Sequence, residues 1–145
     1  MEDKEAALEA LKGAERWLGA SQTEAGDGNY DIALYGLEMA VEIALKAVML
    51  SLGADVPKIH DIRDAVAKAV KGDGRVPEEF VASLDEITIM FKRLLDLRQV
   101  SGYTFEAEGE LRKLEAEYNG IAAPAKKAVS ACEKAVHSVS GKGRR

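Results

Sequence analysis

The chain has few of the residues from which metal and nucleophile sites are usually built. It contains one cysteine and two histidines, which excludes an internal disulfide and a cysteine-built metal site. The histidines, His60 and His137, fall on different predicted elements, without the i,i+3 or i,i+4 spacing of a metal-binding pair on one helix. We therefore predict neither a metal site nor a cofactor.

Motifs of familiar enzyme families are missing as well. The chain has no glycine-rich phosphate loop, no GxSxG turn and no HExxH helix. The Glu-x-x-His pattern that a di-iron bundle needs on two helices does not occur. No charged-then-apolar leader opens the chain, and no apolar run approaches the length that spans a membrane. We accordingly expect a cytoplasmic protein with no membrane partner.

The residues that dominate the chain are those of helical proteins. Alanine, leucine and glutamate are the commonest, lysine and valine are frequent, and aromatic residues make up only 6%, a composition that favours helix over sheet. A length of 145 residues suits one domain with a single core. The formal net charge of -5 is mild and does not indicate a platform for nucleic acid.

Apolar residues recur at helical spacing in five segments, which are separated by turn residues. We predict a loop over 21–29, an end of the second helix at Gly53, and Pro77 in the first position of the fourth helix. The predicted helices cover 2–20, 30–52, 60–71, 77–97 and the chain from Phe105 onward. The predicted fold class is all-α, an up-down bundle of four to five helices.

This bundle is predicted to form a single domain over residues 1–140, followed by a basic flexible tail over 141–145. Pro124 interrupts the last predicted helix, where it either kinks the helix or restarts it. Cys132 falls in the apolar stripe of the same helix, so we interpret it as a small core residue.

The second predicted helix carries polar residues at fixed spacing although apolar residues surround it, as in a central helix. Glu42 and Lys46 stand one turn apart, and Glu38 stands one turn before them. Two interpretations remain open. The first is a simple i,i+4 ion pair, and the second is a groove that binds a ligand or a partner.

Other polar residues have similar alternatives. His60 either contacts a ligand or helps to begin the third predicted helix. Arg98 either binds phosphate as a bidentate fork or forms a structural ion pair. Ser101 either caps the turn after it or donates to phosphate, and Tyr103 either stacks on a base or packs into the core or an interface.

Two segments together resemble a known family. The run YDIALYGLEMAVEIALKAVML at 30–50 is similar to the second helix of the HEPN domain, with its "AvE-x-x-x-K" core, and KIHDI at 58–62 is similar to that family's "tHdL". Members of this helical family commonly form symmetric dimers. Many act as metal-independent ribonucleases or as partners of nucleotidyltransferases.

The resemblance also locates the family's nuclease motif, Arg-x4-6-His, at the end of the fourth helix. Arg98 matches the arginine, but Tyr103 stands where the histidine of the shortest version belongs, and Thr104 and Phe105 follow it. Phe105 also replaces the tyrosine of the His-x-Tyr branch, whose tyrosine receives nucleotidyl groups. Because the pKa of tyrosine lies near 10, it is a poor base at neutral pH.

We therefore expect a homodimeric HEPN domain without efficient nuclease activity, which binds a nucleotide, RNA or a nucleotidyltransferase partner. Arg98, Ser101 and Tyr103 are the expected ligand-binding residues near the end of the fourth helix. The expected residues elsewhere are Glu42, Lys46 and His60. The alternative is a toxin-like, metal-independent ribonuclease that uses Arg98 with Tyr103, or with His60 as the substitute histidine.

Overall fold

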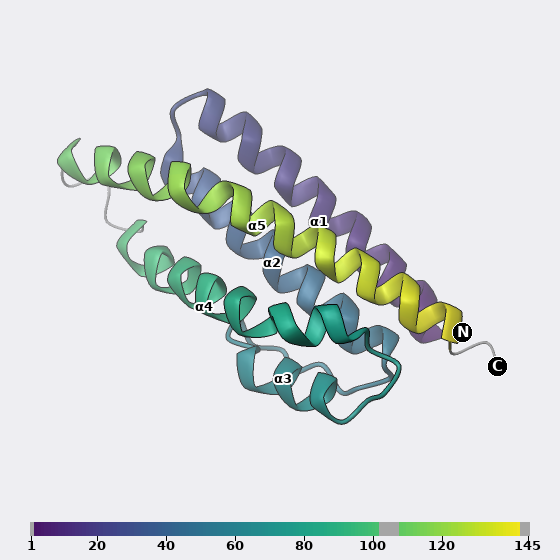
Figure 1. Cartoon of the computed structure of the whole chain (residues 1–145). Helices are drawn as coiled ribbons and strands as arrows, with labels where there is room; N and C mark the ends of the chain where they lie inside the picture. The colour runs from purple at the N-terminus through teal and green to yellow at the C-terminus, as the bar shows by residue number, and fades with distance from the viewer. Residues whose placement is uncertain (1, 102–107, 143–145) are drawn as a thin grey trace.

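A computed structural model shows five α-helices and, in the residues it describes, no strand (Figure 1). The structure describes residues 2–101 and 108–142, and the side chains of residues 4–98 and 112–141. The helices are α1 (Glu2–Gly26), α2 (Tyr30–Ser51), α3 (Arg63–Lys71), α4 (Glu78–Ser101) and α5 (Glu108–Lys142). The predicted all-α fold class is thus confirmed.

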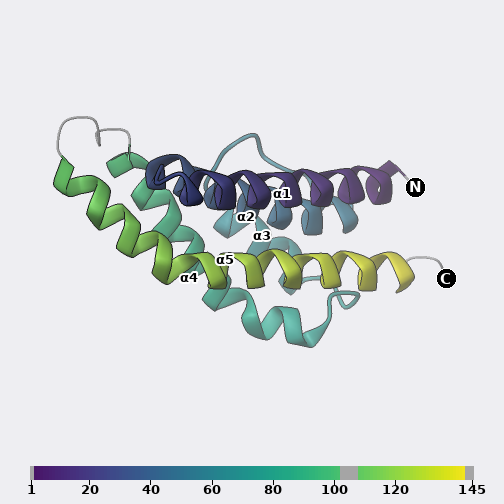
Figure 2. The same cartoon turned by 90° about the horizontal axis from the view of Figure 1, so that it is seen from above.

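The four long helices run side by side, and each is antiparallel to the long helix before it (Figures 1 and 2). The short α3 lies beside α4 on the outside of the four long helices (Figure 1), and it contacts α2 and α4. The N- and C-termini therefore lie at the same end of the molecule (Figure 1). No helix in the described part of the chain is both long enough and apolar enough to cross a membrane.

The core is built around α2, which contacts the four other helices. Its apolar side chains are buried on every face that meets a neighbour, and Leu45 is fully buried. Because Ala40, Ala44 and Ala47 are also fully buried, adjacent helices can approach the α2 backbone closely. The prediction that this segment is the central helix is confirmed. Glu38 and Glu42 are its buried charged residues, and they begin the candidate site.

The prediction of a loop over 21–29 was wrong for most of its length, since α1 continues to Gly26. The buried Ser21 hydroxyl donates to the Ala33 carbonyl at 2.7 Å, which ties the end of α1 to α2. The Thr23 hydroxyl donates back to the Gly19 carbonyl at 3.1 Å, so neither side chain ends the helix. The actual turn is short and depends on Gly28, whose φ of 82° is the left-handed conformation that glycine tolerates.

Two predicted helix starts were early. The third helix begins at Arg63 instead of residue 60, and Ile62 is its N-cap residue. Just before it, the Asp61 carboxylate accepts a hydrogen bond from the Arg63 backbone N–H at 3.3 Å, which forms a local turn. Pro77 precedes α4 instead of lying in its first position, and its carbonyl accepts from the Val81 N–H. The predicted end at Gly53 is confirmed by its φ of 73° just after α2.

Helix α5 is one continuous helix that contains Pro124, so the alternative of a restart is wrong. Its axis bends along its length (Figure 2), as expected where proline removes an i→i−4 hydrogen bond. Cys132 is fully buried, which confirms its core position. The predicted start near Phe105 and the last three residues of the predicted tail lie outside the described residues.

Candidate functional site

One face of α2 carries Tyr35, Glu38, Glu42 and Lys46. The first three meet polar or aromatic partners from other parts of the chain, and Lys46 pairs with Glu42 on the same helix. We call these four residues the α2 stripe. Their spacing of three, four and four residues places them in one line along the helix. The stripe meets α4 and the connection between α2 and α3, which supply Arg98 and His60.

The carboxylate of Glu42 binds two partners. Lys46 Nζ donates to Oε2 at 3.0 Å, and His60 Nδ1 lies 2.9 Å from Oε1, where its N–H donates to the carboxylate. The Glu42 side chain is almost fully buried, whereas that of His60 is 54% exposed. The predicted ion pair of Glu42 and Lys46 is therefore present, but it is joined to a histidine from another element.

Two described residues, Glu38 and Tyr35, hold Arg98. Its Nη1 donates to Glu38 Oε1 at 2.9 Å, and its guanidinium lies 4.9 Å from the centre of the Tyr35 ring, a cation–π distance. Tyr35 is in turn set edge-on to Trp17 at 5.7 Å. The side chain of Arg98 is 30% exposed. The structural ion pair expected for Arg98 is thus present, on a guanidinium that also reaches the surface.

Glu38 is in an unfavourable position for a charged group. It is fully buried, and its Oε2 is the buried side-chain oxygen that has no hydrogen-bond partner among the described residues. Burial, together with the nearby charge of Glu42, raises the pKa of Glu38 to about 7, although Arg98 and His60 act in the opposite direction. The protonated and the ionised form of this carboxyl group are therefore both populated near neutral pH.

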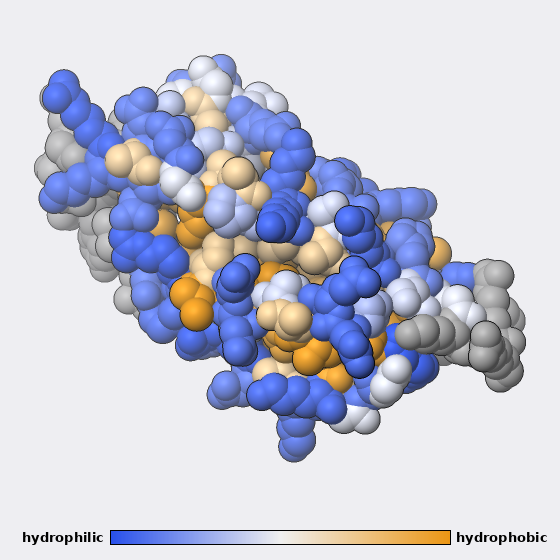
Figure 3. Space-filling view, in the orientation of Figure 1, coloured by the Kyte–Doolittle hydropathy of each residue, from blue (hydrophilic) through white to orange (hydrophobic). Residues whose placement is uncertain are grey.

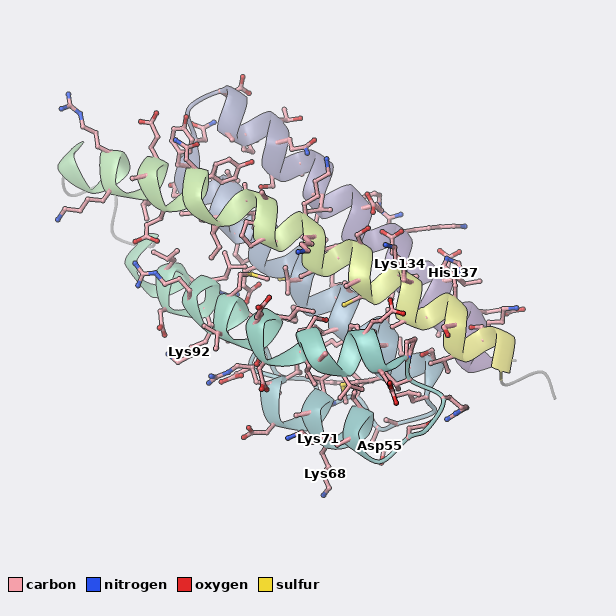
Figure 4. The ribbon with its side chains drawn as sticks, in the orientation of Figure 1. Asp55, Lys68, Lys71, Lys92, Lys134 and His137 are labelled. Atoms are coloured by element: carbon pink, nitrogen blue, oxygen red, sulfur yellow. The ribbon has the colours of Figure 1, made fainter. Side chains whose placement is uncertain are left out.

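An open depression of about 580 Å³ lies beside this cluster. It is lined by His60, Asp61, Lys92, Leu95, Asp96 and Arg98. Lys92 projects from α4 (Figure 4) and forms an ion pair with Asp96, while Asp61 pairs with Arg63 at 2.8 Å. The charges on the rim are therefore largely balanced in pairs.

The structure brings four of the six predicted site residues together: Glu42, Lys46, His60 and Arg98. For Ser101 it describes only the backbone, at the last residue of α4, and Tyr103 lies outside the described residues. His137 lies elsewhere, on α5 (Figure 4), in a depression that Glu15 and Glu133 also line.

The sequence prediction missed two contributors to the site. Tyr35 is not among the predicted site residues, yet it lies under the guanidinium of Arg98. Its position three residues before Glu38 on the same helix face was the available signal. Lys92 carried no such signal, because its place on the rim depends on how α4 meets the connection between α2 and α3.

Another concave surface lies between α4 and α5, away from the α2 stripe. It measures about 400 Å³ and is lined by apolar residues that include Ile87, Met90 and Pro124. Figure 3 shows apolar side chains in the strip between these two helices. The charged residues of the site lie on the other concave surface, which therefore remains the candidate for ligand chemistry.

The family model of the HEPN domain matches residues 7–140. The chain belongs to the HEPN domain family. The match includes the whole α2 stripe, His60 and Arg98. The resemblance drawn from the segments 30–50 and 58–62 is therefore confirmed. Comparisons with curated proteins and with solved structures gave no match.

Within this HEPN domain, the two segments that carried the resemblance meet in space. The Glu42 carboxylate from the "AvE-x-x-x-K" segment bonds to His60 from the "tHdL" segment. Glu38, one turn earlier, bonds to Arg98 at the end of α4. The arginine that the resemblance places in the family's nuclease motif is thus connected to both segments through the α2 stripe.

Proposed function

We propose that this HEPN domain binds RNA or a nucleotide through a phosphate group, with Arg98 as the principal contact. The observation that carries the proposal is the position of Arg98, which Glu38 and Tyr35 hold at the edge of the open depression. A planar guanidinium matches the oxygens of phosphate, and a guanidinium that is already held loses little conformational entropy on binding.

The other charges around the depression define the kind of ligand. Lys92 and His60 add positive or hydrogen-bonding groups, whereas Asp61 and Asp96 add negative ones. The chain as a whole has a net charge of -5. Binding to a duplex depends on many phosphate contacts, which this surface does not offer. A single-stranded RNA segment or a free nucleotide, with one or two phosphates at Arg98, fits it better.

Homodimerisation is part of the same proposal. It is supported by the family, whose members commonly form symmetric dimers, and by the exposed apolar side chains beside the concave surface between α4 and α5. Ile89 on α4 is 72% exposed and lines a second hollow against α5. A dimer would place two copies of Arg98 in one assembly, and sedimentation equilibrium measures its presence directly.

A ribonuclease is the second candidate function, and the contact between His60 and Glu42 favours it. A carboxylate on Nδ1 fixes the imidazole tautomer and leaves Nε2 as a base. His60 would take the proton of a 2′-hydroxyl, whose oxygen then attacks the adjacent phosphorus while Arg98 stabilises the added charge. The 5′-oxygen would leave with a proton from water, which gives a cyclic phosphate and a 5′-hydroxyl end.

The decisive experiment incubates labelled single-stranded RNA with the protein in the presence of EDTA. Wild type, Arg98→Ala and Arg98→Lys are compared with Arg93→Ala as the matched control. Arg93 lies on the same helix but pairs with Glu117, away from the depression. Because Arg93 lines the same hollow as Ile89, sedimentation equilibrium first checks that Arg93→Ala associates like wild type. We expect a retarded RNA band for wild type and for Arg93→Ala, and its loss in Arg98→Ala.

The lysine variant distinguishes charge from shape. It keeps a cation for Glu38 but lacks the bidentate fork, so we expect weakened binding with unchanged helicity by circular dichroism. Equal retardation in all four proteins would remove Arg98 from the site. Cleaved RNA with wild type, lost in His60→Ala, would replace the binding function by the ribonuclease. Intact and unretarded RNA in every lane would contradict both functions and direct the search to a protein partner.

A further inference from the structure

Three potential metal ligands converge where the α2 stripe meets the connection between α2 and α3. One atom each from Glu38, Glu42 and His60 lies within 4.8 Å of the other two, and no other such group of three occurs among the described residues. The prediction of no metal site considered cysteines, histidine pairs on one helix and the Glu-x-x-His pattern, but not ligands that two elements bring together. These donors come from two elements, 18 residues apart between Glu42 and His60.

The carboxylate oxygens are arranged so that one oxygen of each points to a cationic side chain. Glu38 Oε1 accepts from Arg98, and Glu42 Oε2 accepts from Lys46. The other oxygen of each carboxylate, Glu38 Oε2 or Glu42 Oε1, then faces the cluster of the three ligands. Glu38 Oε2 is buried without a partner in the described part of the chain, and such an atom costs about 1–3 kcal/mol unless a proton or a cation satisfies it.

We propose that a divalent ion of the Zn²⁺ class binds between Glu38 Oε2, Glu42 Oε1 and His60 Nδ1. Two carboxylate oxygens and one imidazole nitrogen are a ligand set for zinc, which takes three protein ligands and water where its site stays open to solvent. The imidazole nitrogen selects against Mg²⁺ and Ca²⁺, which prefer oxygen ligands in larger number. This site goes beyond the proposed binding of RNA, which needs no metal.

The geometry requires a small movement of one ligand. Two ligands about 2.1 Å from a tetrahedral ion lie about 3.4 Å apart, whereas His60 Nδ1 is now 2.9 Å from Glu42 Oε1. His60 supplies the movement, because its side chain is half exposed and it lies between α2 and α3, outside both helices. Both carboxylates stand on the rigid α2. On binding, the imidazole loses the Nδ1 proton and keeps one on Nε2.

Arg98 and Lys46 influence the ion in two ways. Each holds the outer oxygen of a ligand, which orients the carboxylate in the way that surrounding hydrogen bonds orient metal ligands. Their positive charges also lower the affinity, compared with a site of two unpaired carboxylates. The Lys46 side chain is 21% exposed, so its ammonium group can move to solvent when the ion enters.

Calorimetric titration of the metal-stripped protein with Zn²⁺ tests this site directly. We expect one ion per chain. Glu38→Gln, which keeps an acceptor for Arg98, and His60→Gln should each weaken binding at least about 10-fold, as the loss of even an outer partner does. Glu133→Gln is the matched control, because Glu133 faces Glu15 in a separate carboxylate pair near His137, and it should bind Zn²⁺ like wild type.

Several results would overturn the proposal. One is the absence of a saturable heat with wild type, and another is equal affinity in wild type and in both ligand variants. If only Glu133→Gln lost Zn²⁺ binding, the site would instead lie on the surface of α1 and α5. Titration with Co²⁺ in place of Zn²⁺ gives a second readout, since visible absorption bands must appear with wild type and disappear with His60→Gln. The RNA experiment contains EDTA, so the failure of one proposal leaves the other unaffected.

Discussion

Replacing Glu38 by glutamine removes an ionisable group from the centre of the bundle while keeping its size and one hydrogen-bond acceptor. The wild-type side chain is fully buried, with Oε1 bonded to Arg98 at 2.9 Å and Oε2 unpartnered among the described residues. Burial and the charge of Glu42 raise the pKa of Glu38 to about 7 from 4.5. This difference makes the stability of the fold depend on pH.

The sign of the dependence follows from the two pKa values. Below pH 4.5 the carboxyl group is protonated in the folded and the unfolded chain, so its favourable contribution is fully present. Between pH 4.5 and about 7 only the unfolded chain loses the proton, and the free energy of unfolding falls as pH rises. At 1.36 kcal/mol per pH unit, Glu38 should lower the free energy of unfolding of the wild type by roughly 2–3 kcal/mol between pH 5 and pH 8.

Urea unfolding followed by circular dichroism at pH 5, 6, 7 and 8 measures this dependence. A side-chain hydrogen bond with Glu15, together with burial, also raises the pKa of Glu133 to about 7, so both proteins carry Glu133→Gln to remove a second group that titrates in the same range. EDTA excludes the ion proposed for the cluster. The free energy of unfolding should fall with pH in the Glu38 protein and change less in the Glu38→Gln protein.

The comparison uses the difference between the two pH profiles, so a constant cost of the substitution cancels. The attraction between Arg98 and the ionised carboxylate is already part of the pKa of Glu38, so its loss in the variant belongs to the measured difference in slope. Parallel profiles would refute the reasoning. A Glu38 protein that gained stability toward pH 8 relative to the variant would show that Arg98 and His60, rather than burial, determine the ionisation of Glu38.

The helices could largely be predicted from the sequence, since their periodicity reflects burial in one core. The segment predicted over 30–52 agrees with α2 to within a residue, because Gly53 provides a local stop signal. The end of α1 could not be predicted in the same way. Ser21 and Thr23 are typical of loops, but each hydroxyl bonds to a backbone carbonyl that the folded bundle or the helix itself presents.

The candidate site was predictable in its members but not in its contacts. The spacing of Glu38, Glu42 and Lys46 along one helix is enough to place them on a common face. The bonds of this face to His60 and Arg98 join residues 18 and 60 positions apart. Such contacts depend on how α4 and the connection after α2 pack, which the local pattern does not encode. The family resemblance supplied Arg98, and the packing supplied its partners.

The remaining predictions concern packing. Phe91 is fully buried on α4, so Phe91→Ala should lower the free energy of unfolding by about 3–5 kcal/mol in urea unfolding, and a loss below about 1 kcal/mol would contradict its core role. Gly36 marks a close approach of α1 and α2, because a Cβ there would lie 3.0 Å from the Ser21 Cβ and 3.3 Å from the Trp17 carbonyl oxygen. Gly36→Ala should therefore destabilise the protein by about 1–3 kcal/mol despite the better helix propensity of alanine. Gly19→Ala, in α1 with no atom within 4 Å of the added Cβ, should instead stabilise it by up to about 1 kcal/mol. The two substitutions must change the free energy of unfolding in opposite directions. Equal changes would show that helix propensity, not contact between α1 and α2, determines the effect at Gly36.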